Sequence, residues 1–158
     1  MSPVGIGYDS HRLEPGRRLI LGGVEIEHDR GLAGHSDADV LTHAVIDALL
    51  GAAGLADIGH HFPDTDPEFR NADSIELLAQ VRRLLDGQGL RTTYVDATVI
   101  AEAPKLGPHR DPIRDSLAAA LGLDRGSVSV KFTTNEGMGF VGRSEGMAAM
   151  AVATLESP

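Results

Sequence analysis

The sequence predicts an α/β (α+β) fold in which a mixed β-sheet carries helices on one face. Two observations indicate this. Short segments rich in β-branched residues alternate with segments that show a helical apolar stripe. The chain of 158 residues is long enough for one core, too short for a (β/α)₈ barrel, and not divided by a linker, charge block or repeat. We therefore expect residues 1–158 to form a single domain.

The first third predicts a strand, a hairpin and a helix. Residues 4–8 are apolar and read as a strand, and residues 17–29 read as a hairpin that turns at Gly22–Gly23. An apolar stripe over residues 40–49 follows and predicts a helix. Ser36 is expected to be its N-cap and Gly51 to end it.

A long polar segment separates this helix from the next. The sixteen residues "GLADIGHHFPDTDPEF", 54–69, are expected to form an irregular loop, and loops of that length tend to be functional. A second helix is expected after Asp73, which caps it, with Glu76 completing a capping box. Its stripe ends before Gly87.

The second half predicts two strands, a helix and one undecided segment. "RTTYVDATVIA", 91–101, and "SVSVKFTT", 127–134, alternate as strands do, the second with Val128, Val130 and Phe132 facing inward. Pro112–Leu121 is expected to be a helix capped by Asp111. "GMAAMAVATL", 146–155, fits either a helix or a buried strand.

Composition excludes several classes of function. The chain has no cysteine, which rules out disulfides, thiolate zinc fingers and cysteine nucleophiles. Its net charge of −9 disfavours nucleic acid and anionic membranes as partners, and 4% aromatic residues disfavour base stacking. No signal peptide or membrane span is recognisable, so we expect a cytoplasmic protein. A phosphate ligand would need local cations, which bound metal supplies.

The candidate metal ligands are Asp9, His11 and His43. Asp9 and His11 are two apart on the first predicted strand, so their side chains share a face. His43 lies off the apolar stripe of its helix, with Asp39 and Asp47 one turn away on either side to orient it. One carboxylate and two imidazoles would give zinc an open fourth position. The alternative is a solvated histidine on an acidic helix face.

Two further motifs could meet a ligand. In "GHSDAD", residues 34–39, the start of the predicted helix could attract an anion, although capping alone explains Ser36 and Asp37 and leaves only His35 unexplained. Asp57, Asp64 and Asp66 in the long loop could bind sugar hydroxyls or cations. Ordinary turn chemistry explains these aspartates equally well.

Two predicted strands end in small or hydroxyl residues followed by turn formers, "AEAPK" at 101–105 and "KFTTNEGMGF" at 131–140. Strand ends are where α/β proteins hold ligands. The residues that could hold a diphosphate and its metal are Lys105, Lys131, Thr133, Thr134 and Glu136. No Walker motif or nucleophile elbow is present, which favours chemistry by positioning and electrostatics.

Taken together, the motifs resemble one enzyme family, the 2-C-methyl-D-erythritol 2,4-cyclodiphosphate synthases of the non-mevalonate isoprenoid pathway. The resemblance spans nearly the whole chain. It rests on Gly7, Asp9 and His11 and on the segments "AGHSDADVLTHAVIDALLGAAGL", "DIGHHFPDTDP", "AEAPKLGPH" and "TTNEGMGFVGRSEG", in the family's order and spacing. It implies an intramolecular phosphoryl transfer, a phosphorus–oxygen lyase reaction. A 2-phosphate attacks the β-phosphorus of 4-diphosphocytidyl-2-C-methyl-D-erythritol 2-phosphate, closes the cyclodiphosphate and releases CMP.

The resemblance also implies roles for individual residues. It assigns Zn²⁺ to Asp9, His11 and His43, and Mg²⁺ or Mn²⁺ to Glu136. It implies catalytic roles for His35, Thr134 and Asp64. The substrate contacts it implies are Ser36, Asp57, Gly59, Asp64, Ala101, Pro104, Lys105, Leu106, Thr133, Thr134, Phe140 and Arg143. A homotrimer with sites between subunits is implied as well, and it favours a strand over residues 146–155.

This chain departs from the family pattern at two positions. Ala38 stands where the family usually has glycine, a change we expect to be tolerated. Some members bind an isoprenoid diphosphate near the positions of Phe140 and Arg143, with an acidic residue where this chain has Met150. Two rival interpretations of the same motifs are a small zinc-dependent phosphohydrolase and a nucleotide-binding or metal-buffering protein without turnover.

Overall fold

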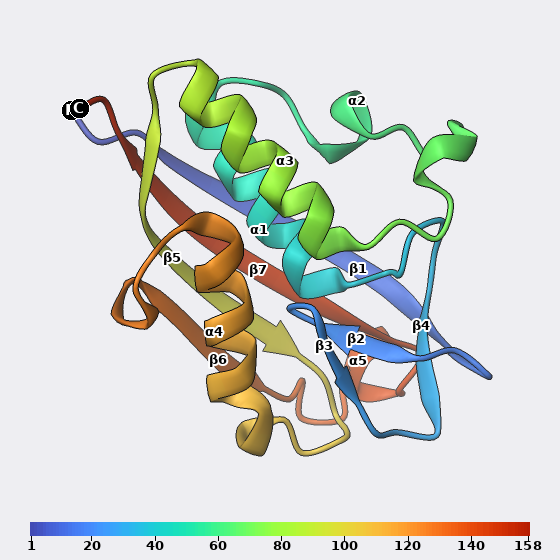
Figure 1. Ribbon diagram of the computed structural model, residues 1–158. Helices are drawn as coiled ribbons and strands as arrows, with labels where there is room; N and C mark the ends of the chain where they lie inside the picture. The colour runs from blue at the N-terminus through green and yellow to red at the C-terminus, as the bar shows by residue number, and fades with distance from the viewer.

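The computed structural model describes all residues, 1–158, and is built on a five-stranded sheet with the strand order β4-β1-β7-β5-β6 (Figure 1). The strands are β1 (Val4–Pro15), β4 (Arg30–Ala33), β7 (Gly146–Glu156), β5 (Arg91–Ile100) and β6 (Val128–Thr133). β5 and β6 are parallel, whereas every other pair is antiparallel. The predicted mixed sheet is confirmed.

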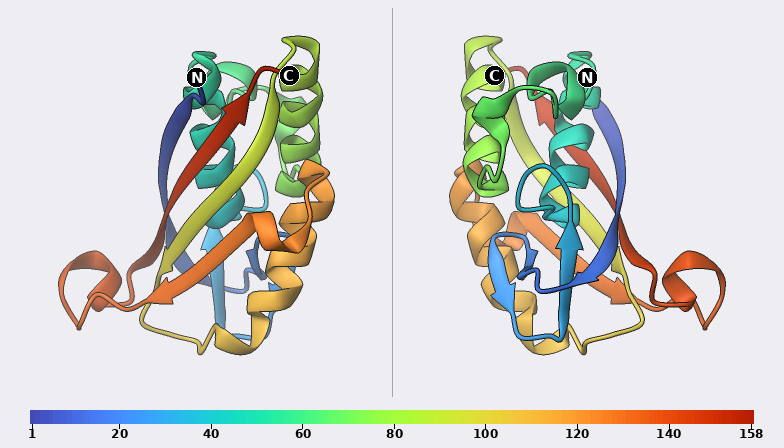
Figure 2. Two further views of the ribbon diagram at one scale, coloured as in Figure 1. Left: turned by 90° about the vertical axis from the view of Figure 1, so that its left-hand side faces the viewer. Right: turned by 90° about the vertical axis from the view of Figure 1, so that its right-hand side faces the viewer.

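Three long helices cover one face of this sheet (Figures 1 and 2). They are α1 (Val40–Ala53), α3 (Ser74–Gly87) and α4 (Arg110–Leu121). α1 packs on β1 and β7, while α3 lies against α1 and α4. The remaining elements are short: β2 (Leu19–Leu21), β3 (Val24–Ile26), α2 (Ile58–His61), α5 (Gly139–Gly142) and the 3₁₀ turns η1 (Pro67–Phe69), η2 (Gly107–His109) and η3 (Arg125–Ser127). Helices on one face and the 19–26 hairpin are confirmed.

Both predicted ends of the first helix were wrong. The N-cap is Asp39, whose side chain accepts a hydrogen bond from the Thr42 N–H, so α1 begins three residues after the expected site. Ala38 turns the chain just before it, with a φ of 57° in the left-handed region. α1 then continues through Gly51 and ends at Gly54, which adopts the left-handed C-cap conformation.

Other predicted boundaries also shift. β1 runs seven residues beyond Tyr8 because its later half pairs with both β4 and β7. The loop 54–69 contains α2 and η1, each begun by an aspartate that caps it. α4 begins at Arg110 and not at Pro112; η2 leads into it and no side chain caps its start. The Asp73 cap of α3 is confirmed.

The segment that the residues alone left undecided is the central strand. β7 pairs along its length with β1 on one side and β5 on the other. Its inward alanines are buried under α1, where small side chains let the helix lie close to the sheet. In β6, Val128 and Val130 are buried as expected, while Phe132 is half-buried with Arg110 stacked over its ring.

The closest contact between the layers is the one between α1 and β1. A Cβ atom added to Gly7 would lie 1.9 Å from the carbonyl oxygen of Ala44, and one added to Gly5 would lie 2.0 Å from that of Ala48. The helix backbone therefore rests directly on the strand backbone. This contact fixes the separation between β1, which carries Asp9, and α1, which carries His43.

The opposite face of the sheet has no helix over it (Figure 2). Large apolar side chains on β1, β5 and β7 are exposed there, with exposed fractions between 41% and 67%. They are Val4, Ile6, Tyr8, Tyr94, Met150 and Val152. A continuous set of this kind usually marks an interaction surface.

Substitution of Gly7 by alanine tests the contact between α1 and β1. We expect the added methyl group to push α1 from the sheet and to lower the free energy of unfolding by about 1–3 kcal/mol. Gly51→Ala is the matched control, because a Cβ there meets only the Ile6 carbonyl at 3.8 Å and replaces a helical glycine. Urea unfolding of both variants would contradict this account if Gly7→Ala were as stable as Gly51→Ala.

Candidate metal centre and adjoining cavity

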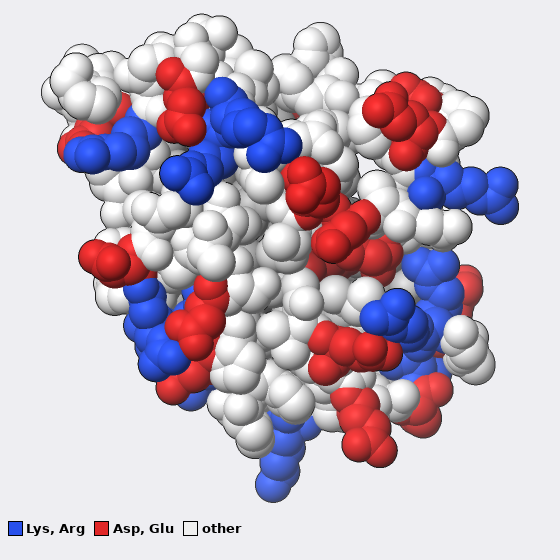
Figure 3. Space-filling view, in the orientation of Figure 1, with Lys and Arg blue, Asp and Glu red and all other residues white.

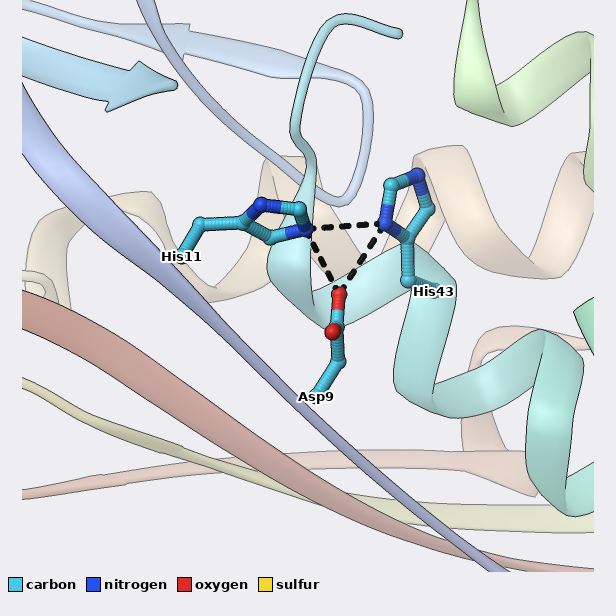
Figure 4. A group of neighbouring side chains, drawn as sticks. All are labelled: Asp9, His11 and His43. Carbon is cyan, nitrogen blue, oxygen red and sulfur yellow. Dashed lines mark hydrogen bonds and ion pairs between the residues drawn. The ribbon is translucent and has the colours of Figure 1, made fainter. Parts of the chain in front are cut away.

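Asp9, His11 and His43 converge as the spacing predicted (Figure 4). Asp9 and His11 project from the same face of β1, and His43 projects from the first turn of α1. Asp9 Oδ2 lies 2.8 Å from His11 Nε2 and 3.0 Å from His43 Nδ1, and the two nitrogens are 3.2 Å apart. Ligands of a tetrahedral zinc ion at 2.0–2.1 Å are separated by roughly 3.3 Å, so this donor set has suitable spacing for such an ion.

Each histidine is oriented through its other ring nitrogen. His11 Nδ1 lies 3.0 Å from the Ala33 carbonyl oxygen, which only accepts, so that nitrogen carries the proton. His43 Nε2 lies 2.8 Å from Ser74 Oγ and 3.2 Å from Ser36 Oγ. Both contacts direct one nitrogen of each ring toward Asp9.

The expectation that Asp39 or Asp47 orients His43 was wrong. The Asp39 carboxylate accepts hydrogen bonds from the N–H groups of Gly22 and Gly23 and from Thr42. Asp47 accepts from the Ile58 N–H at the start of α2. The alternative of a solvated His43 is also wrong, because only 8% of the residue is exposed.

The charges of the triad are coupled. Burial acts to raise the pKa of Asp9, but hydrogen bonds and charge from both histidines outweigh it and lower the pKa to about 2. Burial acts to lower the pKa of His11, but the hydrogen bond and charge of Asp9 outweigh it and raise that pKa. Without metal, Asp9 and His11 therefore each stabilise the charged form of the other.

The triad forms part of the wall of a cavity of about 420 Å³. Four other residues predicted for the site line it, namely His35, Ser36, Gly59 and Asp64. His35 Nε2 lies 3.1 Å from the backbone carbonyl of Asp66, which ties the 34–36 turn to the loop that carries Asp64. Asp57 lies just outside, where it caps α2 by accepting from the His60 N–H.

The remaining predicted residues do not line this cavity. They lie at the end of β6 or in the segments after β5 and β6, and Figure 2 shows the chain after β6 projecting beyond the body of the molecule. These residues are Ala101, Pro104, Lys105, Leu106, Thr133, Thr134, Glu136, Phe140 and Arg143. Lys131 forms an ion pair with Asp96 on the sheet, with its Nζ 2.7 Å from the carboxylate.

Glu102 joins the two predicted halves of this second group. Its carboxylate accepts the N–H of Asn135 at 2.7 Å and that of Gly137 at 2.9 Å. The turn between them holds Glu136 at a φ of 54°, with its side chain exposed. The loop after β5 thereby holds the turn after β6, a connection that the sequence pattern did not reveal.

Sequence reasoning missed the apolar part of the cavity and the contacts behind His43. Ile58, Phe62, Phe69 and Leu77 contribute apolar surface to the wall. They come from segments read as loop and helix core, so no spacing rule distinguished them. The available signal was the position of Ser74, which is the first residue of α3 after its cap. A polar side chain at a helix end can point toward a neighbouring site.

Charged side chains of both signs cover the face that carries the helices. Figure 3 shows acidic and basic side chains interspersed over the helix-covered face, without a broad basic area. Several arginines are paired, such as Arg18 with Glu25 and Arg125 with Asp115. None of the helices has both the length and the apolar character needed to cross a bilayer.

The mixed sheet with helices on one face defines an α+β protein. Its three candidate ligands form a candidate site for a divalent metal ion, and they lie in the wall of a cavity large enough for a small ligand. Comparison with known proteins gives the family. The chain belongs to the YgbB family, which its residues 3–156 match. The resemblance seen in the motifs is confirmed.

Named relatives and solved structures agree with this assignment. The 2-C-methyl-D-erythritol 2,4-cyclodiphosphate synthase of Thermosynechococcus vestitus is 60% identical over 154 residues, covering 98% of this chain and 96% of that protein. A CDP-bound structure of a synthase of the same name has a TM-score of 0.89 at 40% identity, covering 97% and 99% of the two chains. The bifunctional IspDF of Campylobacter jejuni reaches 0.96 at 42% identity, and all of this chain matches 43% of that one.

The stability of the metal-free protein should depend on pH through the triad. The lowered pKa of Asp9 contributes stability above 3.8 that is lost toward pH 2, and the raised pKa of His11 contributes stability below 6.5 that is lost above it. The pair therefore stabilises most between about pH 4 and 6.5, by about 2.5 kcal/mol, which corresponds to the lowering of the Asp9 pKa from 3.8 to about 2. Urea unfolding in the presence of a chelator should show that the difference in free energy of unfolding between wild type and Asp9→Asn is largest in this pH window. The difference should become smaller at lower and at higher pH. A difference that does not change with pH would contradict this role of the Asp9–His11 pair.

Proposed function

We propose that this protein converts 4-diphosphocytidyl-2-C-methyl-D-erythritol 2-phosphate into 2-C-methyl-D-erythritol 2,4-cyclodiphosphate and CMP. The observation that carries the proposal is the Asp9–His11–His43 triad in the wall of a cavity that also contains His35, Ser36 and Asp64. The names of the relatives support the same reaction for those proteins. The single domain is proposed to be one cyclodiphosphate synthase domain, and the chain a cytoplasmic phosphorus–oxygen lyase.

The triad is proposed to hold Zn²⁺, and Glu136 to hold Mg²⁺ or Mn²⁺. Two imidazoles and one carboxylate at these separations suit a zinc ion with one open position, and an exposed carboxylate suits a hard cation. Divalent ions there would polarise phosphoryl oxygens and offset negative charge that develops during transfer. The protein supplies no nucleophile, because the attacking oxygen belongs to the substrate.

The protein's own residues then bind and orient. His35 and Ser36 are proposed to bind the 2-phosphate. Asp64 and the apolar wall of the cavity are proposed to bind the methylerythritol. Asp57 and Gly59 are proposed to bind the ribose. The cytidine and CMP phosphates are proposed to meet the segments after β5 and β6, with Thr134 beside the reacting phosphates. The members of this second set are Ala101, Pro104, Lys105, Leu106, Thr133 and Thr134, with Phe140 and Arg143 nearby on the projecting segment.

We further propose a homotrimer with each site shared between neighbours. In one chain the residues assigned to cytidine and to the second cation do not line the cavity that holds the triad, and those that follow β6 are on a segment that projects outward (Figure 2). The bare sheet face exposes apolar residues of β1, β5 and β7 that a closed ring would bury. Shared sites explain both features together.

The reaction itself is tested by its products. With the cytidyl substrate and Mg²⁺, we expect phosphorus NMR to show a cyclic diphosphate and CMP in equal amounts, and no inorganic phosphate. Release of inorganic phosphate would indicate a metal-dependent phosphohydrolase instead. Stoichiometric binding of CDP without any turnover would indicate a binding protein.

The metal assignment is tested by removing its ligands singly. His11→Ala and His43→Ala should each lose stoichiometric zinc and activity while the fold persists, because the core does not depend on the centre. Zinc content by atomic absorption and the far-ultraviolet circular dichroism spectrum separate metal loss from unfolding. Arg18→Ala is the control, because Arg18 is exposed, pairs with Glu25 and does not line the cavity. Full zinc content in both histidine variants would refute the assignment.

The shared site is tested by mixing two inactive variants. His11→Ala damages the zinc half and Glu136→Gln the cytidine half, so in a mixed ring one interface always joins two intact halves. Random equal mixing makes about three quarters of the trimers mixed, each with about one good site in three, which restores about a quarter of wild-type activity.

A site built within one chain would behave differently, because every chain carries a lesion. Native mass spectrometry confirms that mixed trimers have formed. Activity that stays at the level of the separate variants in such a sample would exclude the shared site.

A further inference from the structure

We propose that Asp37 and Ser74 are positioning residues that commit His43 to bind the metal ion through Nδ1. The inference rests on the proposed metal site and names the groups that prepare one of its ligands. Ser74 Oγ lies 2.8 Å from His43 Nε2 and donates its own proton to Asp37 Oδ1. Neither Asp37 nor Ser74 is one of the three ligands.

The direction of the hydrogen bonds follows from what each group can donate. The Asp37 carboxylate accepts all of its contacts, from the Ser74 hydroxyl, the Ser74 N–H and the Asp39 N–H. A serine hydroxyl has a single proton, and here Asp37 takes it. Ser74 Oγ can therefore only accept from His43, so Nε2 carries the hydrogen and the lone pair of the neutral ring is on Nδ1, which points at Asp9.

Burial makes this arrangement costly to reverse. Ser74 is fully buried and only 8% of His43 is exposed, so little solvent can replace a missing partner on this side of the ring. If the proton of His43 moved to Nδ1, the one hydroxyl proton would have to serve both Nε2 and the Asp37 carboxylate. Either Asp37 would lose the proton that Ser74 donates to it, or Nε2 would keep only the longer contact with the Ser36 hydroxyl, at 3.2 Å.

Backbone contacts hold the two groups in place. The Asp37 N–H donates to the Ala72 carbonyl, and the Ser74 N–H donates to Asp37 Oδ2. The turn before α1 is thus joined to the start of α3, and the hydroxyl of Ser74 is aimed from a helix end. Ser36 Oγ also approaches Nε2, but at 3.2 Å and while accepting from the Ala38 N–H.

The two histidines consequently differ. His11 gives its Nδ1 proton to the Ala33 carbonyl and presents Nε2, while His43 gives its Nε2 proton to Ser74 and presents Nδ1. A carboxylate behind a ligating histidine orients the ring and raises its basicity, and losing such a partner weakens metal affinity by about 10–100-fold. Here the carboxylate acts through the serine hydroxyl.

The variants compare two serines that approach the same nitrogen. Zn²⁺ dissociation constants, measured by competition with a chromophoric chelator, should be about 10–100-fold higher for Ser74→Ala than for wild type. Ser36→Ala, the matched control, should change the constant far less, and Ser74→Thr should restore affinity because it keeps the hydroxyl. The Zn²⁺ dissociation constant of Asp37→Asn should lie between those of wild type and Ser74→Ala, because the amide oxygen still accepts the hydroxyl proton but carries no negative charge.

A second measurement needs no variant. Nitrogen-15 NMR of the zinc-loaded wild-type protein should show His11 coordinated through Nε2 and His43 through Nδ1, with a slowly exchanging Nε2–H on His43. Coordination of His43 through Nε2 would overturn the proposal, whether or not the Ser74 variants fold. So would a Ser74→Ala variant that folds and binds Zn²⁺ as tightly as wild type. If wild-type protein binds no Zn²⁺, the proposed metal site fails and this inference fails with it.

Discussion

The direct contact between α1 and β1 is the constraint on which the site depends. Gly5 and Gly7 have no side chain to hold the helix away, and the carbonyls of Ala44 and Ala48 fill that space. A ligand on a helix and two on a strand can share one ion only if the two backbones keep a fixed short separation. The residue next to Ala44 is His43, so the contact that brings the layers together lies beside the ligand that must be placed.

Besides the apolar core, two carboxylates join segments that are distant in the chain. Asp37 links the turn before α1 to the start of α3, and Glu102 links the loop after β5 to the turn after β6. Each carboxylate satisfies backbone N–H groups that would otherwise lack partners. Asp37 thus lies behind His43, one of the ligands proposed for zinc, and Glu102 joins the two segments proposed for cytidine.

The sequence predicted the mixed sheet, the three long helices and the candidate triad, but it did not predict β4 and left the central strand β7 undecided. Alternation and helical stripes are local, and the strand spacing of Asp9 and His11 fixes their common face. Local patterns failed where long-range contacts decide. Ser36 looked like the N-cap, but its hydroxyl faces His43 and the Ala38 N–H, and Asp39 caps α1. Ser74 could not be matched to His43, because their meeting depends on how α3 packs against α1.

The buried carboxylate of Asp39 joins the hairpin turn to the start of α1, and this contact should also link the local unfolding of the two segments. It accepts from Thr42 at the start of α1 and from Gly22 and Gly23 in the hairpin turn, and it is fully buried. If the hairpin opened alone, a carboxylate would lose two donors in an apolar site. We therefore expect the hairpin and the first turn of α1 to open as one cooperative unit, so that hydrogen exchange of their amides gives one common free energy of opening.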